Sequence, residues 1–413
     1  MKRILIIGHT FPEPLTTAAG GRMMQLIDLL LEEGYQITFA STANSSERSE
    51  DLSKLGIFTE NIELNNSSFD VFISKLKPIV VVFDRYITEE QFGWRVSEQC
   101  PDALRILDTE DLHFLRKARQ EAVKKNIPAA EANLFTETAK RELASILRSD
   151  VSLIISEYEM KLLQETFRIS SEILHYLPFL VNKTSKSLKN APYYEERADF
   201  ITIGNLLHAP NVNSVLRLKK EIWPLIRKEL PQANLCVYGA YAPQQILELH
   251  NEKEGFLIRG WAKDVSEVLQ NARVCLAPVQ FGAGLKGKLL DAMLYGAPSV
   301  TTTIGAEGMH GDLPFSGAIE DDSQEFSNAS VALYTQQNMW LKYQQYGFDI
   351  IESRFQKDLF SDAFKQLLIN LCSNIKEHRE HNFMGQILEH QTLQSTRYMS
   401  KWIEEKNQLK SEK

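Results

Sequence analysis

Residues 277–293 read APVQFGAGLKGKLLDAM. The apolar run at residues 274–277 is typical of a buried strand, three glycines follow within a short loop, and apolar residues at helical spacing come next. Glycine lets backbone N–H groups approach an anion closely, and the N-terminus of a helix carries about half a positive charge. Lys286 and Lys288 add two cations, with Asp291 one helical turn beyond them. The stretch predicts a strand, a turn and a helix whose start could hold a diphosphate.

A second interpretation of this stretch stays open. The sequence is neither a Walker motif nor a G-x-G-x-x-G fingerprint, and its spacing also fits a plain turn with a surface ion pair between Lys288 and Asp291. The next block, residues 296–309, predicts another strand and a loop with a single acid, Glu307. That carboxylate could accept hydrogen bonds from ribose or sugar hydroxyls, or it could be an ordinary solvated loop acid.

Strands and helices alternate on both sides of residues 181–198, which lack an apolar period and are predicted to be an exposed linker. The strands predicted before the linker are residues 4–7, 35–39, 79–83, 104–107 and 151–155, and those after it are residues 200–203, 235–238, 256–258, 274–277 and 299–302. This alternation predicts parallel sheets covered by helices. We therefore expect an α/β protein of two similar units that face each other across a cleft, with ligands bound beyond the carboxyl ends of the strands.

Beyond about residue 355 the pattern is purely helical. One apolar face, predicted to dock on the second domain, contains Leu359, Phe360, Phe364, Leu367 and Leu368. Residues 391–413 place Met399, Trp402 and Ile403 on one face of a charged helix, which we interpret as a docking helix rather than a membrane-surface helix. The predicted organisation is a first domain over residues 1–182, a linker over 183–198, a second domain over 199–371 and a helical extension over 372–413.

The composition of the 413 residues is that of a folded protein, with 43% apolar and 24% charged residues. The net charge of −8 gives no basic footprint for nucleic acid. Four distant cysteines, without a C-x-x-C motif, favour a reducing compartment over disulfides or a zinc site. The apolar run at residues 4–7 is too short for a signal peptide, and no run reaches the roughly 18 apolar residues of a membrane span. We expect a soluble, cytoplasmic protein with at most peripheral membrane contact.

Residues 282–308 closely resemble the donor-binding half of family 4 (group 1) glycosyltransferases, which have the GT-B fold. Those proteins carry a pattern like G-x-G-x-K-x-K-x-L-E-A-M-x-x-G-x-P-V-V-x-T, followed by G-A-E-G. Here the pattern is matched by residues 282–293, Gly296, Pro298, Val300, Thr302 and residues 305–308. The resemblance extends upstream to about residue 198, through Gly204 and Asn205, and more weakly to Gly20 and Gly21 in the first half.

The resemblance implies two Rossmann-like domains, an acceptor-side domain first and a nucleotide-sugar-binding domain second. It also implies metal-independent, retaining transfer of a sugar from a nucleotide-diphosphate donor to a glycan or lipid-linked acceptor, as in cell-surface polysaccharide biosynthesis, with no cofactor besides the nucleotide sugar. The donor-binding residues that follow from it are Gly20, Gly21, Gly204, Asn205, Gly282, Gly284, Lys286, Lys288, Asp291, Gly305 and Glu307. Lys286, Lys288 and the amides near Gly284 would stabilise the departing diphosphate.

The chain departs from the family pattern at three places. Ala283 stands where members often have a glutamate, and the shorter Asp291 stands where they have a second one. Asn205 and His208 occupy the neighbourhood of an arginine and a lysine of the family. These differences leave the identity of the sugar open and place the phosphate charge on Lys286 and Lys288.

On the acceptor side, residues 108–113 read DTEDLH and resemble the corresponding loop of some family members. The catalytic candidates here are His113 and Asp108. Imidazole titrates near neutrality, so His113 could accept or orient the proton of a hydroxyl group. The other interpretation is a packing histidine in the first turn of a helix.

Two further functions fit the same residues. A glycosyltransferase-like protein without activity could serve as a binding subunit, as the missing acid at Ala283 suggests. A GT-B epimerase could act on the nucleotide sugar itself. The glycosyltransferase is our main hypothesis.

Overall fold

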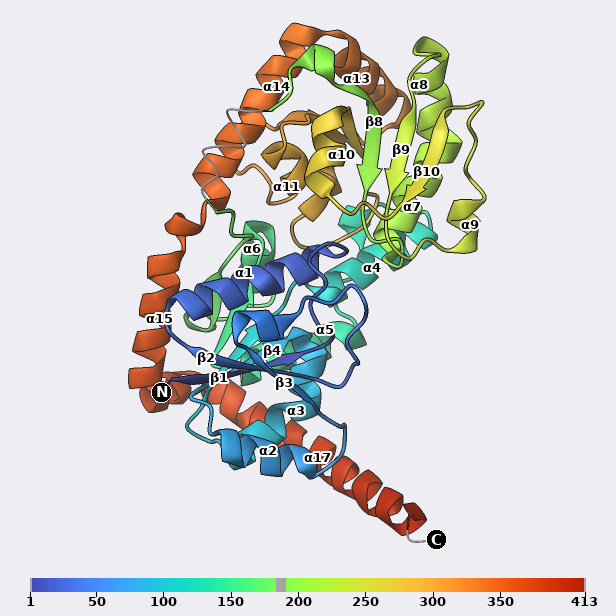
Figure 1. Ribbon diagram of the computed structural model, residues 1–413. Coiled ribbons are helices and arrows are strands. Elements are labelled where there is room, and N and C mark those ends of the chain that lie inside the picture. Colours follow the sequence, from blue (N-terminus) through green and yellow to red (C-terminus); the bar gives the residue numbers. More distant parts are fainter. Residues whose placement is uncertain (1, 183–190, 412–413) are drawn as a thin grey trace.

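The computed structural model describes residues 2–182 and 191–411 and contains one parallel β-sheet in each half of the chain (Figure 1). The first sheet has the strand order β3-β2-β1-β4-β5-β6-β7 and the second has the order β10-β9-β8-β11-β12-β13. The first set is β1 Arg3–Gly8, β2 Gln36–Ser41, β3 Phe58–Asn61, β4 Val80–Asp84, β5 Leu104–Asp108, β6 Val151–Ile154 and β7 Leu174–Tyr176. The second is β8 Ala198–Ile203, β9 Leu235–Tyr238, β10 Phe256–Gly260, β11 Ala272–Ala277, β12 Ser299–Thr301 and β13 Gly317–Ile319. The predicted α/β class with two units is confirmed.

Helices connect the strands and cover both sheets (Figure 1). Those of the first half are α1 Ala18–Glu32, α2 Ser68–Leu76, α3 Arg85–Gln99, α4 His113–Lys124, α5 Glu137–Arg148 and α6 Glu157–Glu165. Those of the second half are α7 Ala209–Arg217, α8 Trp223–Glu229, α9 Gln244–Leu247, α10 Val265–Asn271, α11 Gly287–Leu294, α12 Thr303–Ala306, α13 Ser323–Thr335 and α14 Gln337–Ile350. The last three are α15 Ser361–Ser373, α16 Ile375–His381 and α17 Phe383–Ser411.

The sequence of β1 explains its place at the centre of the first sheet. Successive side chains of a strand point to opposite faces. Ile4 and Ile6 belong to the apolar cluster on one face, and Leu5 and Ile7 to the cluster on the other. All four are at most 1% exposed. A strand covered on both faces requires such an uninterrupted apolar run.

Only part of the predicted linker can be compared with the structure, because residues 183–190 lie outside the described residues. Arg197 is fully buried and donates hydrogen bonds to the carbonyl groups of Leu269 at 3.0 Å and Tyr295 at 2.7 Å. The prediction of an exposed linker is therefore wrong for Arg197, which is anchored in the second domain, whereas Tyr193, Glu195, Glu196 and Ala198 are exposed as predicted.

Helix α15 returns to the first domain. Phe364, Leu368 and Leu371 are buried in the same apolar cluster as Ile4 and Ile6 of β1. The prediction that the apolar face of residues 359–368 docks on the second domain is wrong. Helical spacing identifies an apolar face but not the surface that it covers.

The two segments that connect the domains lie side by side. The N–H of Val181 donates to the carbonyl of Phe355 at 2.7 Å, and the N–H of Lys357 donates to the carbonyl of Val181 at 2.9 Å. The chain therefore leaves the first domain and returns to it at one place.

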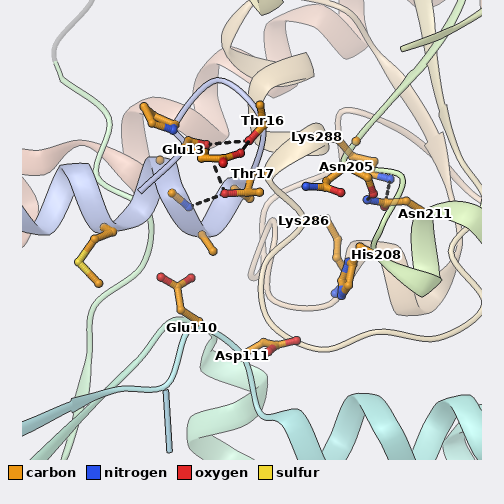
Figure 2. A pocket seen from close by; sticks show the side chains of 18 of the residues that line it. Glu13, Thr16, Thr17, Glu110, Asp111, Asn205, His208, Asn211, Lys286 and Lys288 are labelled. Carbon is orange, nitrogen blue, oxygen red and sulfur yellow. Dashed lines mark hydrogen bonds between the residues drawn. The ribbon is translucent and has the colours of Figure 1, made fainter. Parts of the chain in front are cut away.

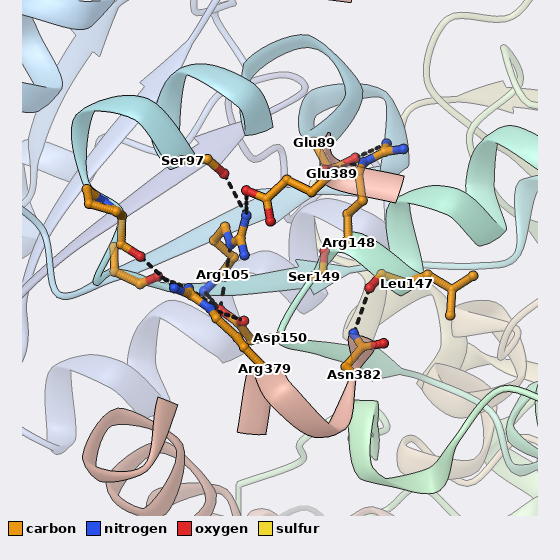
Figure 3. Close-up of polar contacts among 12 residues, drawn as sticks. Glu89, Ser97, Arg105, Leu147, Arg148, Ser149, Asp150, Arg379, Asn382 and Glu389 are labelled. Carbon is orange, nitrogen blue, oxygen red and sulfur yellow. Dashed lines mark hydrogen bonds and ion pairs between the residues drawn. The ribbon is translucent and has the colours of Figure 1, made fainter. Parts of the chain in front are cut away.

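Polar contacts fix the last two helices to the first domain (Figure 3). Arg379 of α16 binds both carboxylate oxygens of Asp150, at 2.7 and 2.9 Å. Glu389 of α17 accepts a hydrogen bond from Arg105 at 2.6 Å. Because Asp150 and Arg105 are buried, these contacts join the extension firmly to the sheet.

The end of α17 docks through a polar face. Ser400 accepts a hydrogen bond from Arg95 at 3.2 Å, and Glu404 accepts one from the N–H of Ser67 at 2.8 Å. Met399 and Trp402, predicted on the docking face, are 65% and 61% exposed. The prediction of a docking helix is confirmed as far as Glu404, but the contacts are made by a different face from the predicted one. None of the helices in the described ranges is long and apolar enough to cross a membrane.

Candidate active site between the two domains

A cavity of about 830 Å³ lies between the two domains. Its walls come from the loops that follow β1, β4 and β5 in the first domain and β8, β9, β10 and β11 in the second. The carboxyl ends of both parallel sheets therefore meet there, which is where such sheets bind ligands. Figure 2 shows Glu13 and Glu110, from two loops of the first domain, facing Lys286 and Lys288 across the cavity.

The first turns of α1 and α11 meet at this cavity. A Cβ on Gly287 would lie 2.7 Å from the Cβ of Ala18, and one on Gly20 would lie 2.5 Å from the backbone of Glu13. Close approach therefore requires glycine at both positions. Lys286, which precedes α11, provides no side-chain cap for that helix. The first amides of α11 thus lack intrahelical partners and are available to a ligand.

Lys286 is buried and Lys288 is half-buried in the cavity wall, and neither has an acidic partner within hydrogen-bond distance among residues 2–182 and 191–411. The Nζ of Lys286 donates to the carbonyl of Gly284 at 2.7 Å, and the Nζ of Lys288 donates to Oδ1 of Asn211 at 2.6 Å. Neither lysine forms an ion pair within residues 2–182 and 191–411, so the surface pair between Lys288 and Asp291 is not formed. Burial lowers the pKa of both ammonium groups to about 8. Buried charges normally have a counter-ion, whereas no carboxylate of the described residues pairs directly with either ammonium group.

Three other predicted donor-binding residues lie near Lys288. Asp291 lines the cavity, and burial raises the pKa of its carboxyl to about 7. A Cβ on Gly204 would lie 2.7 Å from the amide nitrogen of Asn211, which donates to the carbonyl of Asn205 at 2.8 Å. Asn205 and Gly204 therefore position the amide that binds Lys288. Gly20, Gly21 and Gly282 of the predicted set also line the cavity.

Gly284, Gly305 and Glu307 lie outside the cavity wall. The N–H of Gly284 donates to Oε1 of Glu159 at 2.8 Å. Both carboxylate oxygens of Glu307 accept hydrogen bonds from Arg119 at 2.7 Å. The N–H of Gly305 is used to cap α12. The predicted donor contacts of these residues are thus replaced by contacts within the protein, two of which join the domains.

Arg119 and Glu159 of the first domain make these two interdomain contacts. Arg119 also donates to the carbonyl of Gly282 at 2.9 Å. Glu159 accepts a second hydrogen bond from the N–H of Leu112, yet burial raises the pKa of its carboxyl to about 7. Together they close one side of the cavity.

The other side is closed by contacts to the loop after β1. The hydroxyl of Tyr241 donates to Oε2 of Glu13 at 3.0 Å, and Nε1 of Trp261 donates to the carbonyl of Leu15 at 3.0 Å. The guanidinium of Arg48 lies 4.5 Å from the ring centre of Tyr241 and 5.1 Å from that of Trp261. The domains therefore touch on both sides of the cavity.

The two catalytic candidates have different outcomes. Asp108 is fully buried, holds Arg22 at 3.0 Å and does not line the cavity, so the structure gives it a structural contact in place of the predicted role. His113 lines the cavity, with Nε2 3.3 Å from Oδ1 of Asp111. Burial lowers the pKa of His113 to about 3, so the titration near neutrality expected from the sequence is wrong. Its imidazole is neutral at pH 7 and a weak base.

Comparison with known proteins identifies part of the chain. Residues 197–336 match the family described as glycosyl transferases group 1. This part of the chain is a group 1 glycosyltransferase domain. The domain contains Gly204, Lys288 and Asp291, so the resemblance noted in the sequence is confirmed. No curated protein sequence matches the chain.

Solved structures of glycosyltransferases resemble the whole chain. Sucrose-phosphate synthase from Thermosynechococcus elongatus is 13% identical, with a TM-score of 0.67 over 90% of this chain and 100% of that one. A TarM mutant from S. aureus, in complex with fondaparinux, α-GlcNAc-glycerol and UDP, is 9% identical, with a TM-score of 0.66 over 89% and 100%. The pneumococcal O-GlcNAc transferase GtfA, in complex with UDP and GlcNAc, is 11% identical, with a TM-score of 0.66 over 90% and 99%. At these identities the likeness shows the fold, which is GT-B with two Rossmann-like domains.

Proposed function

We propose that this glycosyltransferase moves a sugar from a nucleotide-diphosphate donor to a hydroxyl group of a glycan or lipid-linked acceptor. The observation that carries the proposal is the pair of ammonium groups of Lys286, which is buried, and Lys288, which is half-buried, both without an ion pair in the described residues and both beside the uncapped start of α11. A diphosphate would supply the counter-ion that these two ammonium groups lack. UDP is present in the TarM and GtfA structures, which makes a uridine nucleotide the first candidate for the donor.

The chemistry requires charge stabilisation at this wall. Breaking the bond between the anomeric carbon and the diphosphate develops negative charge on the leaving oxygen and oxocarbenium character on the sugar. The ammonium group of Lys288, positioned by Asn211, and the first amides of α11 would stabilise that charge. Because these groups can supply the positive charge, we propose transfer without a metal ion and with no cofactor besides the nucleotide sugar. The carboxylate of Asp291, one turn into α11, would accept hydrogen bonds from ribose hydroxyls.

Closure of the cavity supports transfer rather than hydrolysis. The contacts of Arg119 with Glu307 and of Tyr241 with Glu13 bring the domains together on opposite sides of the cavity. A closed cavity keeps water away from the activated sugar. The acceptor would enter on the first-domain side, where the loops after β4 and β5 line the wall.

Two finer parts of the proposal rest on the resemblance to group 1 glycosyltransferases. We propose retention of configuration at the anomeric carbon and a role in the synthesis of a cell-surface type of polysaccharide. The coupling constant of the anomeric proton, measured by NMR on the product, tests retention. The opposite configuration in the product would refute it.

The test of the diphosphate site is calorimetric binding of UDP and of UDP-, GDP-, ADP- and dTDP-glucose. Lys288→Ala is expected to weaken binding more than tenfold, since it removes a counter-charge. Lys253→Ala, which changes an exposed lysine of the same domain, is the matched control and should leave the affinity unchanged. EDTA should have no effect. Equal affinity of the Lys288→Ala variant and the unchanged protein would refute the site.

Turnover separates the three functions considered. A transferase releases nucleotide when an acceptor is supplied, whereas an epimerase converts the donor alone into a second sugar, which proton NMR detects. Tight binding of nucleotide sugar with neither reaction, across a panel of acceptors, would favour an inactive binding subunit.

A further inference from the structure

Glu110 is a carboxyl group of the cavity wall that the protein leaves without a partner. It follows β5, is 9% exposed and has a left-handed backbone with φ of 61°. Its Oε1 is buried without a hydrogen bond, and its carboxyl makes no ion pair within residues 2–182 and 191–411. Figure 2 shows this side chain directed toward the loop that carries Glu13 and Thr17, with Lys286 to one side. A buried carboxyl group needs hydrogen-bond partners, so a ligand is expected to supply them.

The cations on this side of the cavity are engaged elsewhere. Three arginines each lie beside an aspartate: Arg22 with Asp108, Arg116 with Asp111 and Arg85 with Asp84. Burial and the nearby charge of Asp108 raise the pKa of the Glu110 carboxyl well above its usual range. A protonated carboxyl group both donates and accepts hydrogen bonds, as a hydroxyl group does. This chemistry suits a neutral, hydroxylated ligand better than a cation or a phosphate.

The position of Glu110 indicates which part of a donor it meets. A Cβ on Gly284 would lie 3.3 Å from the carbonyl oxygen of Glu110 and 2.9 Å from the Cβ of Asp111. Gly284 comes three residues before Gly287, the first residue of α11, where the proposed diphosphate would bind. The sugar is bonded directly to that diphosphate, so it must lie next to it. On the second-domain side, Ala283 offers this space only a methyl group.

We propose that Glu110 binds a hydroxyl group of the donor's sugar. The second domain then holds the nucleotide and the diphosphate, while the first domain selects the sugar across the cavity. This inference rests on the proposed function, because it takes the diphosphate to lie at α11. Sugar selection would depend on domain closure, since the two halves of the donor site lie on different domains.

The test compares a nucleotide sugar with its nucleotide by calorimetry. For each of UDP, GDP, ADP and dTDP, the ratio of the two dissociation constants gives the contribution of the glucose group. In the pair that the unchanged protein binds most tightly, Glu110→Ala is expected to reduce that contribution at least fivefold and to leave nucleotide affinity within twofold. Glu110→Gln, which keeps one acceptor and adds a donor, should retain part of it. Glu165→Ala, at an exposed site of the same domain, is the matched control and should change neither value.

The outcomes are distinct. A sugar contribution unaffected by both Glu110 variants would overturn the inference, and so would a parallel loss for nucleotide and nucleotide sugar. It would also be overturned if the unchanged protein bound nucleotide but gained nothing from the sugar in any pair. Failure of the unchanged protein to bind any nucleotide would instead refute the proposed function. Retained nucleotide binding reports a folded second domain, and an unfolding transition in urea equal to that of the unchanged protein would report a folded first domain, so misfolding of a Glu110 variant is distinguished from loss of sugar binding.

Discussion

Binding of a nucleotide sugar is expected to weaken as the pH rises above about 8. Burial lowers the pKa of Lys286 and Lys288 to about 8 in the free protein. A diphosphate binds the charged ammonium form and would raise both pKa values again, so proton uptake accompanies binding in this range. Rising pH therefore opposes binding.

The size of the effect follows from these values. A lysine with a pKa of about 8 is about 90% charged at pH 7 and about 10% charged at pH 9. Deprotonation of each lysine should therefore weaken binding about tenfold between pH 7 and pH 9, and deprotonation of both up to about 100-fold. A solvated lysine with a pKa of about 10.4 would change affinity by less than about twofold over the same range. The diphosphate of a nucleotide sugar keeps a constant charge over this range, so its own titration does not contribute to the change.

Calorimetry at pH 7, 8 and 9 measures this dependence. Lys288→Arg provides a matched variant, because a guanidinium group stays charged throughout and only Lys286 would still titrate. Its affinity should fall about tenfold instead of about 100-fold. An affinity that stays constant from pH 7 to 9 in the unchanged protein would refute the argument that these two lysines hold the diphosphate.

Two further predictions concern the helix starts and the domain contacts. Gly287→Ala places a methyl group 2.7 Å from the Cβ of Ala18, so it should separate α1 from α11 and weaken nucleotide-sugar binding. Ala18→Gly in the same chain should restore calorimetric affinity, and equally weak binding by both variants would contradict this account. Glu307→Ala removes the carboxylate that pairs with Arg119, whose side chain is 3% exposed. The variant should lower the free energy of unfolding in urea by about 2–4 kcal/mol, because it leaves a buried guanidinium group unpaired. Nucleotide affinity should stay unchanged within about twofold. A tenfold loss of affinity without loss of stability would instead place Glu307 in the donor site.

The central strands could be predicted from the sequence because both of their faces are buried. Residues 4–7 of β1 form an uninterrupted apolar run, which fits a strand buried on both faces better than it fits a helix or a loop. Strand β3 is exposed at every residue, and β7 and β13 have three residues each. These three strands carry little or no apolar pattern, so nothing in the sequence marked them, whereas the edge strand β10 and the three-residue strand β12 could be predicted.

The local part of the site could also be predicted, whereas its long-range part could not. The position of the glycines and lysines at the start of α11 follows from their spacing within one loop and helix, although their contacts with Ala18, Asn211 and Glu159 do not. The contact between Arg119 and Glu307 joins residues 188 apart, and that between Gly284 and Glu159 joins residues 125 apart. Whether Glu110 has a hydrogen-bond partner likewise depends on all the side chains packed around it, which come from distant parts of the sequence. Such features depend on how the two domains pack.

The paired crossing between the domains has a mechanical consequence. A single connecting segment would let one domain swivel about freely rotating bonds. Here the hydrogen bonds of Val181 with Phe355 and Lys357 tie two segments together, so torsion would have to break them. A hinge movement that bends the two segments together leaves these hydrogen bonds intact. Each time the cavity shuts, the carboxyl group on one wall would come back to the same place opposite the ammonium groups on the other.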